Sequence, residues 1–449
     1  MKKTPRTLLE ISEGLARTGM SAQSLLFEAI ERIDDAEGEG ARAFLEVHRE
    51  RARLEAEFSD QIRDKGLVRS PLEGIPISIK DLFDEGGEIT KAGSTALSKA
   101  APATQDSSVV ARLRAAGAVI IGRTNMTEFA FSGLGLNPHY GTPKNPFDRK
   151  TGRIPGGSSS GAAVSVADDM AAAAIGSDTG GSVRIPSALC GLTGFKPTQR
   201  RIPLDGVFPL STTLDSIGPL ARSVSCCEML DAVMANEPYD PVVPRPVKGL
   251  RLGVPQSFVL DGMDDIVANT FEAALKKLSD AGAVIEEVPM TELLELPQIN
   301  SGGGFATAES YAIHRKLMEK AGTQYDPRVK VRIERGAKQT AADYIDLLNA
   351  RQDLQNRVNA HSSPFNALVL PTVPLIAPPI AELENDEDAY HTTNILMLRN
   401  PSVGNFLDRC AITLPCHKLG DAPVGLMLMG ETMGDKKLLA VAKGIERAL

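Results

Sequence analysis

The sequence predicts an α/β fold in which helices alternate with short buried strands. Two observations lead to this prediction. Amphipathic helix-like segments end at a glycine and are followed by a short apolar run, as at Gly117 and Gly282. Other short apolar runs, at residues 75–79, 250–254 and 367–370, end at Lys or Pro. Helices that alternate with short buried strands are typical of α/β layer folds.

The first half of the chain supplies several of these elements. Residues 8–16 and 21–33 are amphipathic and are predicted as helices that pack on the core or on a second subunit. Ser107 and Ser108 can cap a helix that Gly117 ends, because glycine adopts the left-handed conformation at little cost. Residues 118–121 then read as a strand.

The second half repeats the pattern. Residues 266–278 are predicted as a helix and residues 283–288 as a strand. Prolines are dense between residues 237 and 248, which we interpret as a surface linker between two halves of the chain. The acidic residues 382–388 are predicted as a solvated loop.

Composition and charge exclude several classes of partner. The 449 residues include 49 basic and 57 acidic side chains, for a net charge of −8, which disfavours nucleic acid or an anionic membrane as the main partner. No apolar segment approaches the roughly 20 residues that a membrane-spanning helix needs. Trp is absent, which disfavours an aromatic platform for single-stranded nucleic acid.

The five cysteines are odd in number and fit no zinc-binding spacing, so we expect reduced thiols. Residues 1–6 are basic, but no apolar core of signal-peptide length follows them. Together these features predict a cytoplasmic protein.

Two glycine–serine segments are the candidates for chemistry. They are residues 156–161 (Gly-Gly-Ser-Ser-Ser-Gly) and 176–182 (Gly-Ser-Asp-Thr-Gly-Gly-Ser), separated by an apolar run at 162–175. The second can place a hydroxyl beside consecutive exposed backbone N–H groups. Such N–H groups stabilise the oxyanion of a tetrahedral intermediate by about 3–4 kcal/mol per donor. A flexible linker or a phosphate-binding loop is the alternative interpretation.

A serine nucleophile needs a base, because its hydroxyl is barely ionised at neutral pH. None of the six histidines lies in a recognisable triad motif. Lys80 is the other candidate, since it ends the apolar run at residues 75–79 and its stem should emerge from a buried strand. Burial disfavours the ammonium form and lowers the pKa of a lysine, so that it can act as a base.

These features occur together in a known family. Lys80 lies in Gly-Ile-Pro-Ile-Ser-Ile-Lys-Asp, and Ser182 follows Ser158 by 24 residues, within the two glycine–serine segments. The chain thereby resembles the amidase signature family, with matches from about residue 70 to 430. Further matching segments are residues 122–129, 194–198, 214–219 and 423–426.

The resemblance implies a fold and a division of the chain. The expected fold is a single large domain, residues 1–449, with a mixed β-sheet core covered by helices on both faces. Its expected parts are an N-terminal helical region (1–65), a core that carries the motifs (66–236), the Pro-rich linker (237–248), and a C-terminal half that completes the sheet and the pocket (249–449).

The resemblance also implies hydrolysis of a carboxylic amide by a Ser-Ser-Lys triad. Ser182 would be the acylated nucleophile, Ser158 the bridging serine that follows a cis peptide bond, and Lys80 the base. The oxyanion would be held by the backbone N–H groups of Thr179, Gly180, Gly181 and Ser182. Three further residues would support the site: Ser159 by hydrogen bonding to the relay, and Asp178 and Arg184 as a charge pair that shapes the loop.

The substrate pocket is expected after Glu128. By the same resemblance, Ala130 and Ser132 would contact the substrate and Phe131 would form a wall. These small and apolar groups favour a modest neutral or aromatic acyl chain. The resemblance implies no metal and no organic cofactor, and a homodimer is a family-level expectation.

Three alternatives remain open. Residues 157–161 also fit Gly-x-Ser-x-Gly, the nucleophile elbow of α/β-hydrolases, but that elbow follows a buried strand, whereas residues 145–155 are polar and contain prolines. The chain resembles the glutaminase subunit of a tRNA-dependent amidotransferase complex less well after about residue 300. A non-catalytic binding protein on the same fold would not need Lys80, Ser158 and Ser182 together.

Overall fold

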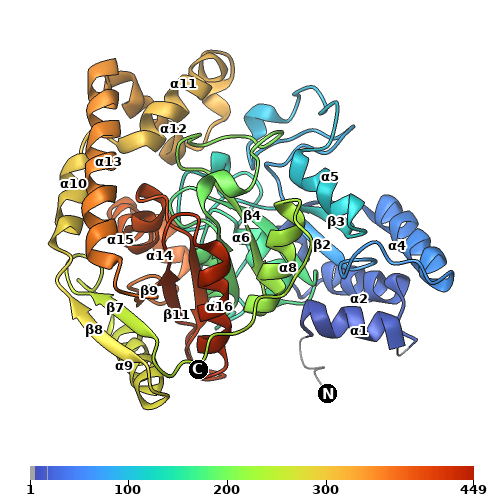
Figure 1. Cartoon of the computed structure of the whole chain (residues 1–449). Helices are drawn as coiled ribbons and strands as arrows, with labels where there is room; N and C mark the ends of the chain where they lie inside the picture. The colour runs from blue at the N-terminus through green and yellow to red at the C-terminus, as the bar shows by residue number, and fades with distance from the viewer. Residues whose placement is uncertain (1–5, 18) are drawn as a thin grey trace.

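One mixed sheet organises the molecule. A computed structural model of the chain describes residues 6–17 and 19–449, so residues 1–5 and 18 of the predicted N-terminal region lie outside it (Figure 1). The described strands form a single 11-stranded sheet with the order β1-β3-β2-β4-β6-β5-β10-β11-β9-β7-β8. The strands are β1 (Phe44–Val47), β2 (Pro76–Lys80), β3 (Val119–Thr124), β4 (Ala173–Asp178), β5 (Thr193–Lys196), β6 (Ser216–Ala221), β7 (Arg251–Pro255), β8 (Val284–Val288), β9 (Ala367–Pro371), β10 (Ala411–Pro415) and β11 (Gly425–Met429).

Helices cover both faces of this sheet, which confirms the predicted single-domain α/β fold. Alternate residues of a strand point to opposite faces. On β11, Leu426 and Leu428 pack in the same cluster as α1, α5, α8, α9 and α16. Met427 and Met429 belong to a second cluster, which includes α13 and α15. Helices α2, α4, α6 and α7 cover other parts of the sheet. These helices are α1 (Leu8–Arg17), α2 (Ala22–Asp34), α4 (Arg49–Asp64), α5 (Ser108–Ala115), α6 (Ser160–Ala167), α7 (Arg184–Leu189), α8 (Val224–Met234), α9 (Asp265–Asp280), α13 (Ala341–Ser362), α15 (Glu387–Phe406) and α16 (Asp435–Glu446).

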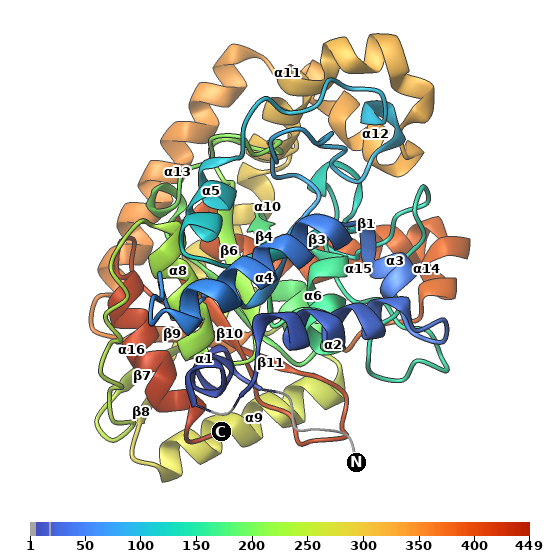
Figure 2. The same cartoon turned by 90° about the vertical axis from the view of Figure 1, so that its right-hand side faces the viewer.

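The remaining helices lie mostly away from the two faces of the sheet. Figures 1 and 2 show α11 and α12 gathered at one end of the molecule, next to the upper end of α13. No helix among the described residues is long and apolar enough to cross a membrane. These helices are α3 (Gly40–Ala43), α10 (Leu296–Ile299), α11 (Gly304–Ala321), α12 (Pro327–Arg335) and α14 (Ile380–Asn385).

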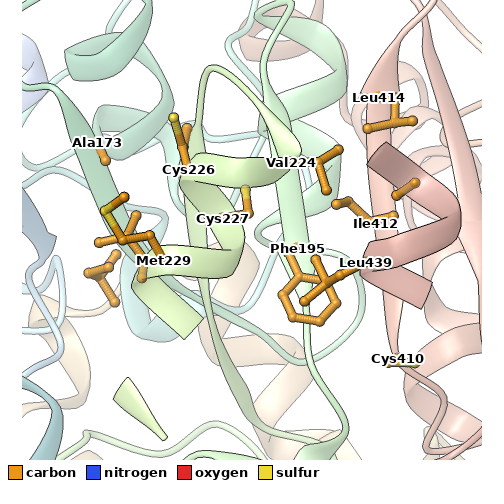
Figure 3. Packing of buried hydrophobic residues seen from close by; sticks show 14 of the residues in the cluster. Ala173, Phe195, Val224, Cys226, Cys227, Met229, Cys410, Ile412, Leu414 and Leu439 are labelled. Atoms are coloured by element: carbon orange, nitrogen blue, oxygen red, sulfur yellow. The ribbon is translucent and has the colours of Figure 1, made fainter. Parts of the chain in front are cut away.

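The core beneath α8 shows how a helix packs against the sheet. Cys226 and Cys227 of α8 lie between the strand that carries Ala173 and the region of Phe195 and Leu439 (Figure 3). All five cysteines of the chain are buried free thiols. They serve here as small apolar residues of the core.

The predicted helix, glycine and strand units are confirmed. Ser107 caps α5, and its Oγ accepts a hydrogen bond from the Val110 N–H at 3.4 Å. Gly117 follows α5 with a φ of 90°, and β3 begins two residues later. The same order recurs at α9, Gly282 and β8.

The region 1–65 is not wholly helical, contrary to expectation. Residues Phe44–Val47 form β1, which pairs antiparallel with β3 at one edge of the sheet. The acidic residues 382–388 are not a loop either, because they end α14 and begin α15. Asp386 caps α15 by accepting hydrogen bonds from the N–H groups of Asp388 and Ala389, and carboxylates stabilise a helix N-terminus.

The Pro-rich segment 237–248 runs without helix or strand between α8 and β7, and its residues are exposed or half-buried. This agrees with the predicted surface connection.

Candidate active site

Lys80 stands at the carboxyl end of β2, where the parallel strand β4 also ends. Its side chain is fully buried. The side-chain nitrogen Nζ lies 2.7 Å from Ser158 Oγ and 2.9 Å from Ser177 Oγ. The register of β2 against β4 explains the contact with Ser177, and the same amine also contacts Ser158, the predicted bridging serine.

The environment of Lys80 favours a neutral amine. Burial lowers the pKa of Lys80 from 10.5 to about 7, against the opposing charges of Asp178 and Asp215. A lysine with this pKa is substantially unprotonated at neutral pH, so its lone pair can accept a proton from a hydroxyl.

Ser158 is held by its backbone. The Gly157–Ser158 peptide bond is cis, as the resemblance implied. The Ser158 carbonyl accepts a hydrogen bond from the Thr127 N–H at 3.0 Å. The next residue, Ser159, donates its N–H to the Ser182 carbonyl at 3.4 Å and its hydroxyl to the Ser177 carbonyl at 3.4 Å. Ser159 thus links the two glycine–serine segments.

Ser182 lies in the turn between β4 and α7 and is 2% exposed. Within the part of the chain that the structure describes, no residue hydrogen-bonds the Ser182 hydroxyl. The backbone contact from Ser159 joins this turn to the segment of Ser158, whose hydroxyl contacts Lys80.

The backbone N–H groups of the turn differ in their availability. Gly181 donates its N–H to Asp178 Oδ1 at 2.9 Å and is therefore occupied. The N–H groups of Thr179, Gly180 and Ser182 have no hydrogen-bond acceptor among residues 6–17 and 19–449. These three N–H groups are free to donate to an oxyanion. The fourth predicted donor, the N–H of Gly181, instead stabilises the conformation of the turn.

Asp178 and Arg184 form a fully buried ion pair, with Oδ1 2.8 Å from Nη2. The carboxylate also accepts a hydrogen bond from the Asn405 side-chain amide at 2.8 Å. Burial alone would raise the pKa of Asp178, but the charge and hydrogen bonds of Arg184 hold it well below its usual range. The carboxylate is ionised, and it accepts hydrogen bonds from the N–H groups of Gly181 and Val183 in the turn.

The predicted pocket segment lies beside the turn. Ala130 lines a small cavity together with Ser177, Thr179, Phe208 and other mainly apolar side chains. Ser132 is buried, and its hydroxyl donates to Asn394 Oδ1 at 2.8 Å. Phe131 is half-buried.

Asp215 closes the same cavity from the residue just before β6, whose first residue pairs with Asp178 of β4. Its carboxylate accepts a hydrogen bond from the Thr179 hydroxyl at 2.6 Å. Burial raises the pKa of Asp215 to about 6 despite this hydrogen bond.

Four residues of the site were not predicted from the sequence: Ser177, Asp215, Asn394 and Asn405. Ser177 and Asp215 lie inside motifs that the sequence already indicates, residues 176–182 and 214–219, so their positions could have pointed to the site. Asn394 and Asn405 belong to α15, more than 200 residues after the catalytic turn, and carry no local signal.

One group of side chains in the described ranges has ligand atoms close enough for a metal ion: Glu46, His48 and Glu88, within 4.8 Å of one another. Lys91 and Arg51 pair with its two glutamates. The group includes no residue of the triad.

Comparisons with known proteins agree on the family. The family model described as Amidase matches residues 24–439. A 2-amino-5-chloromuconic acid deaminase of Comamonas testosteroni is 36% identical over 404 residues, which cover 88% of this chain and 86% of that protein. A glutamyl-tRNA(Gln) amidotransferase subunit of Alkaliphilus metalliredigens is 30% identical over 486 residues, which cover 100% and 97% of the two chains.

Solved structures show the same fold along the whole chain. A crystal structure of an amidase matches with a TM-score of 0.89 and 32% identity, covering 99% of this chain and all of that one. The native peptide amidase of Stenotrophomonas maltophilia matches with a TM-score of 0.77 and 27% identity, covering 99% and 97%.

Proposed function

Because the chain belongs to the amidase family and is therefore a hydrolase of amide C–N bonds, we propose that Ser182, Ser158 and Lys80 are its catalytic triad. One observation supports this assignment above the others. The Lys80 amine is buried, lies 2.7 Å from Ser158 Oγ, and has a pKa lowered to about 7. A serine hydroxyl needs such a base, and the described site places no histidine against either serine.

In this mechanism the neutral amine of Lys80 starts the relay. Lys80 accepts the Ser158 proton while Ser158 accepts the proton of Ser182, and Ser182 Oγ attacks the amide carbonyl carbon. The tetrahedral intermediate places its oxyanion against the N–H groups of Thr179, Gly180 and Ser182. The relay then runs in reverse and protonates the leaving nitrogen, which departs as ammonia or an amine.

Water completes the cycle. It attacks the acyl-enzyme ester on Ser182, and the same relay accepts its proton and returns one to Ser182 Oγ. The ion pair of Asp178 and Arg184 supports both steps, since Asp178 holds the Gly181 N–H and thereby fixes the conformation of the turn.

The substrate is proposed to be a small carboxylic amide. The deaminase relative is named for the removal of an amino group from an unsaturated acid, so such acids belong in the substrate panel. The second candidate function is the glutaminase subunit of a tRNA-dependent amidotransferase, because subunits of glutamyl-tRNA(Gln) amidotransferases align over nearly the whole length. A cytoplasmic location and a homodimer remain predictions.

The nucleophile can be tested by mapping the acyl group. The protein would be mixed with an activated ester of a small acid, quenched in acid during turnover and digested for mass spectrometry. We expect the added acyl mass on the peptide that contains Ser182. Acylation of Ser158 instead would contradict the proposed roles.

A further inference from the structure

One face of α15 lies along the catalytic turn. A Cβ at Gly180 would lie 3.4 Å from Leu398 Cδ2, and a Cβ at Gly181 would lie 2.5 Å from Pro401 Cβ. Leu398 also lies within 3.2 Å of the corresponding position at Gly133. Asn394, one turn before Leu398, is on the same helical face. This face of α15 therefore adjoins both the catalytic turn and the segment after Ser132.

Asn394 presents a fixed amide group to this region. Its Oδ1 accepts hydrogen bonds from the Ser132 hydroxyl at 2.8 Å and from the Gly133 N–H at 2.9 Å. A backbone N–H can only donate, so this contact decides which amide atom is the oxygen. Among the described residues, Nδ2 has no acceptor, although Asn394 is only 7% exposed. The amide therefore carries two N–H donors that the fold leaves unused.

Arg332 of α12 adds a positive charge behind the same segment. Its Nη1 donates to the Phe131 carbonyl at 2.6 Å, and its guanidinium carbon lies 5.1 Å from the centre of the Tyr390 ring. Nη2 is buried without a hydrogen-bond partner. No carboxylate of the described residues lies within ion-pair distance of Arg332, and the residue is only 9% exposed.

A neighbouring arginine shows that this lack of a partner is specific. Arg328 lies one turn earlier on α12 and over the same Tyr390 ring, at 4.3 Å. It is paired with the carboxylate of Glu387. Burying a charge without a counter-charge is costly, so an anion bound nearby would stabilise the unpaired guanidinium through its electric field.

We propose that the acyl chain of the substrate ends in a carboxylate, which accepts from Asn394 Nδ2 and lies in the field of the Arg332 charge. This inference rests on the proposed function, because it names the substrate class of the same site. It replaces the neutral or aromatic acyl chain expected from residues 130–132 alone. The best substrates are then monoamides of dicarboxylic acids, or other acids that carry the scissile C–N bond at the opposite end.

Matched substrate pairs test this proposal. Malonamate, succinamate, glutaramate and adipamate would each be compared with the neutral monoamide of the same chain length. The measured quantity is the ratio of kcat/KM for the acid to kcat/KM for its neutral partner. For the wild-type protein we expect at least one pair with a ratio above about 10, the lower range for a hydrogen bond to a charged group.

Three variants separate recognition of the anion from support of the fold. Asn394→Asp keeps the oxygen that Ser132 and Gly133 contact but puts a negative charge in place of the amide donor. Arg332→Gln removes the charge. Both should lower the ratio at least about 10-fold, mainly through KM of the acid. Arg328→Gln, the matched control, should leave the ratio within about twofold of the wild-type value, because Arg328 already has a carboxylate partner.

The outcomes distinguish this inference from the proposed function. Equal rates on acids and neutral amides, or parallel losses on both substrate classes in Asn394→Asp and Arg332→Gln, would overturn the carboxylate site and leave the amidase assignment intact. For a folded protein that cleaves neither class, calorimetry with Ser182→Ala decides. Binding of glutaramate but not of valeramide would support the site, and equal or absent binding of both would overturn it.

Discussion

Lys80 is the residue on which the proposed mechanism depends. Its ammonium form loses the stabilisation that water would give, and the negative charges of Asp178 and Asp215 only partly offset this loss. A lysine in such a place serves catalysis at the expense of stability, and both effects can be measured.

The pH dependence of the rate should report the protonation of Lys80. With a pKa of about 7, the amine is protonated below neutral pH and cannot accept the serine proton. We expect kcat/KM for a neutral amide to fall about tenfold per pH unit below this value and to level off above it. A rate that stays constant from neutral pH to about pH 5 would contradict a lysine base.

Replacing Lys80 should stabilise the fold. The folded-state pKa lies below the ordinary value of 10.5, so between about pH 7 and 10.5 the unfolded state binds more protons than the native state. The loss of folding free energy caused by burying the charged amine is therefore largest at or below pH 7, and it decreases to zero as the pH rises to 10.5. We expect Lys80→Met to raise Tm by at least about 2 °C at pH 7, with a smaller gain at pH 9. Calorimetric scans at the two pH values would measure this, and a lower Tm at pH 7 would contradict it.

Part of this site could be predicted from the sequence. A lysine at the end of an apolar run and two glycine–serine segments pointed to a nucleophile and a base. The contact of Lys80 with Ser177 was missed, because it depends on the register of β4 against β2. The use of the Gly181 N–H by Asp178 was also missed, since it depends on how the turn closes.

At the scale of elements, the turn between β4 and α7 is clamped from two sides. The ion pair of Asp178 and Arg184 holds it from within, and α15 covers it from outside through Asn405 and Pro401. Of the two glycines in the turn, Gly181 has no room for a side chain, whereas Gly180 does.

Gly181→Ala should damage the enzyme far more than Gly180→Ala. Gly181 has a φ of 127°, and an added Cβ would lie 2.5 Å from Pro401 Cβ and 2.8 Å from Ile185 Cδ1. A Cβ at Gly180 meets only Leu398 Cδ2, at an ordinary 3.4 Å. We expect Gly181→Ala to lose about 10²-fold or more in kcat/KM and to melt earlier, by strain of about 1–3 kcal/mol.

The matched variant Gly180→Ala serves as the control for stability. Its Tm should stay within about 1 °C of the wild-type value, because strain of only a few tenths of a kcal/mol shifts Tm by that little. Equal melting temperatures for the two variants would show that α15 does not confine the turn.

The sequence predicted the elements that have local signals. A capping serine located the start of α5, and glycine stops located the ends of α5 and α9 and the strands β3 and β8 that follow them. The strand β1 and the helix start at Asp386 were missed. Four residues, Phe44–Val47, are too few for a clear alternating pattern, and acidic side chains suit a helix N-terminus as well as a loop.

At the scale of the whole molecule, the sheet joins distant parts of the chain. Strands β10, β11 and β9 lie between β5 and β7, so the C-terminal half completes the sheet that the N-terminal half begins. This order brings α15 over the catalytic turn. No local pattern encodes it, which explains why the fold class could be predicted whereas Asn394 and Asn405 could not.

The most direct test of the central claim is ammonia release by the purified chain alone, with Ser182→Ala as the control. The panel would contain aliphatic, aryl and dicarboxylic monoamides, unsaturated acids that carry an amino group, and glutamine. We predict turnover of at least one amide other than glutamine, and a loss on the order of 10⁶-fold in the variant, as for other deletions of a nucleophile. A variant that keeps more than about a tenth of the wild-type rate would exclude Ser182 as the nucleophile. Activity on glutamine alone, and only with added partner subunits, would favour the amidotransferase function instead.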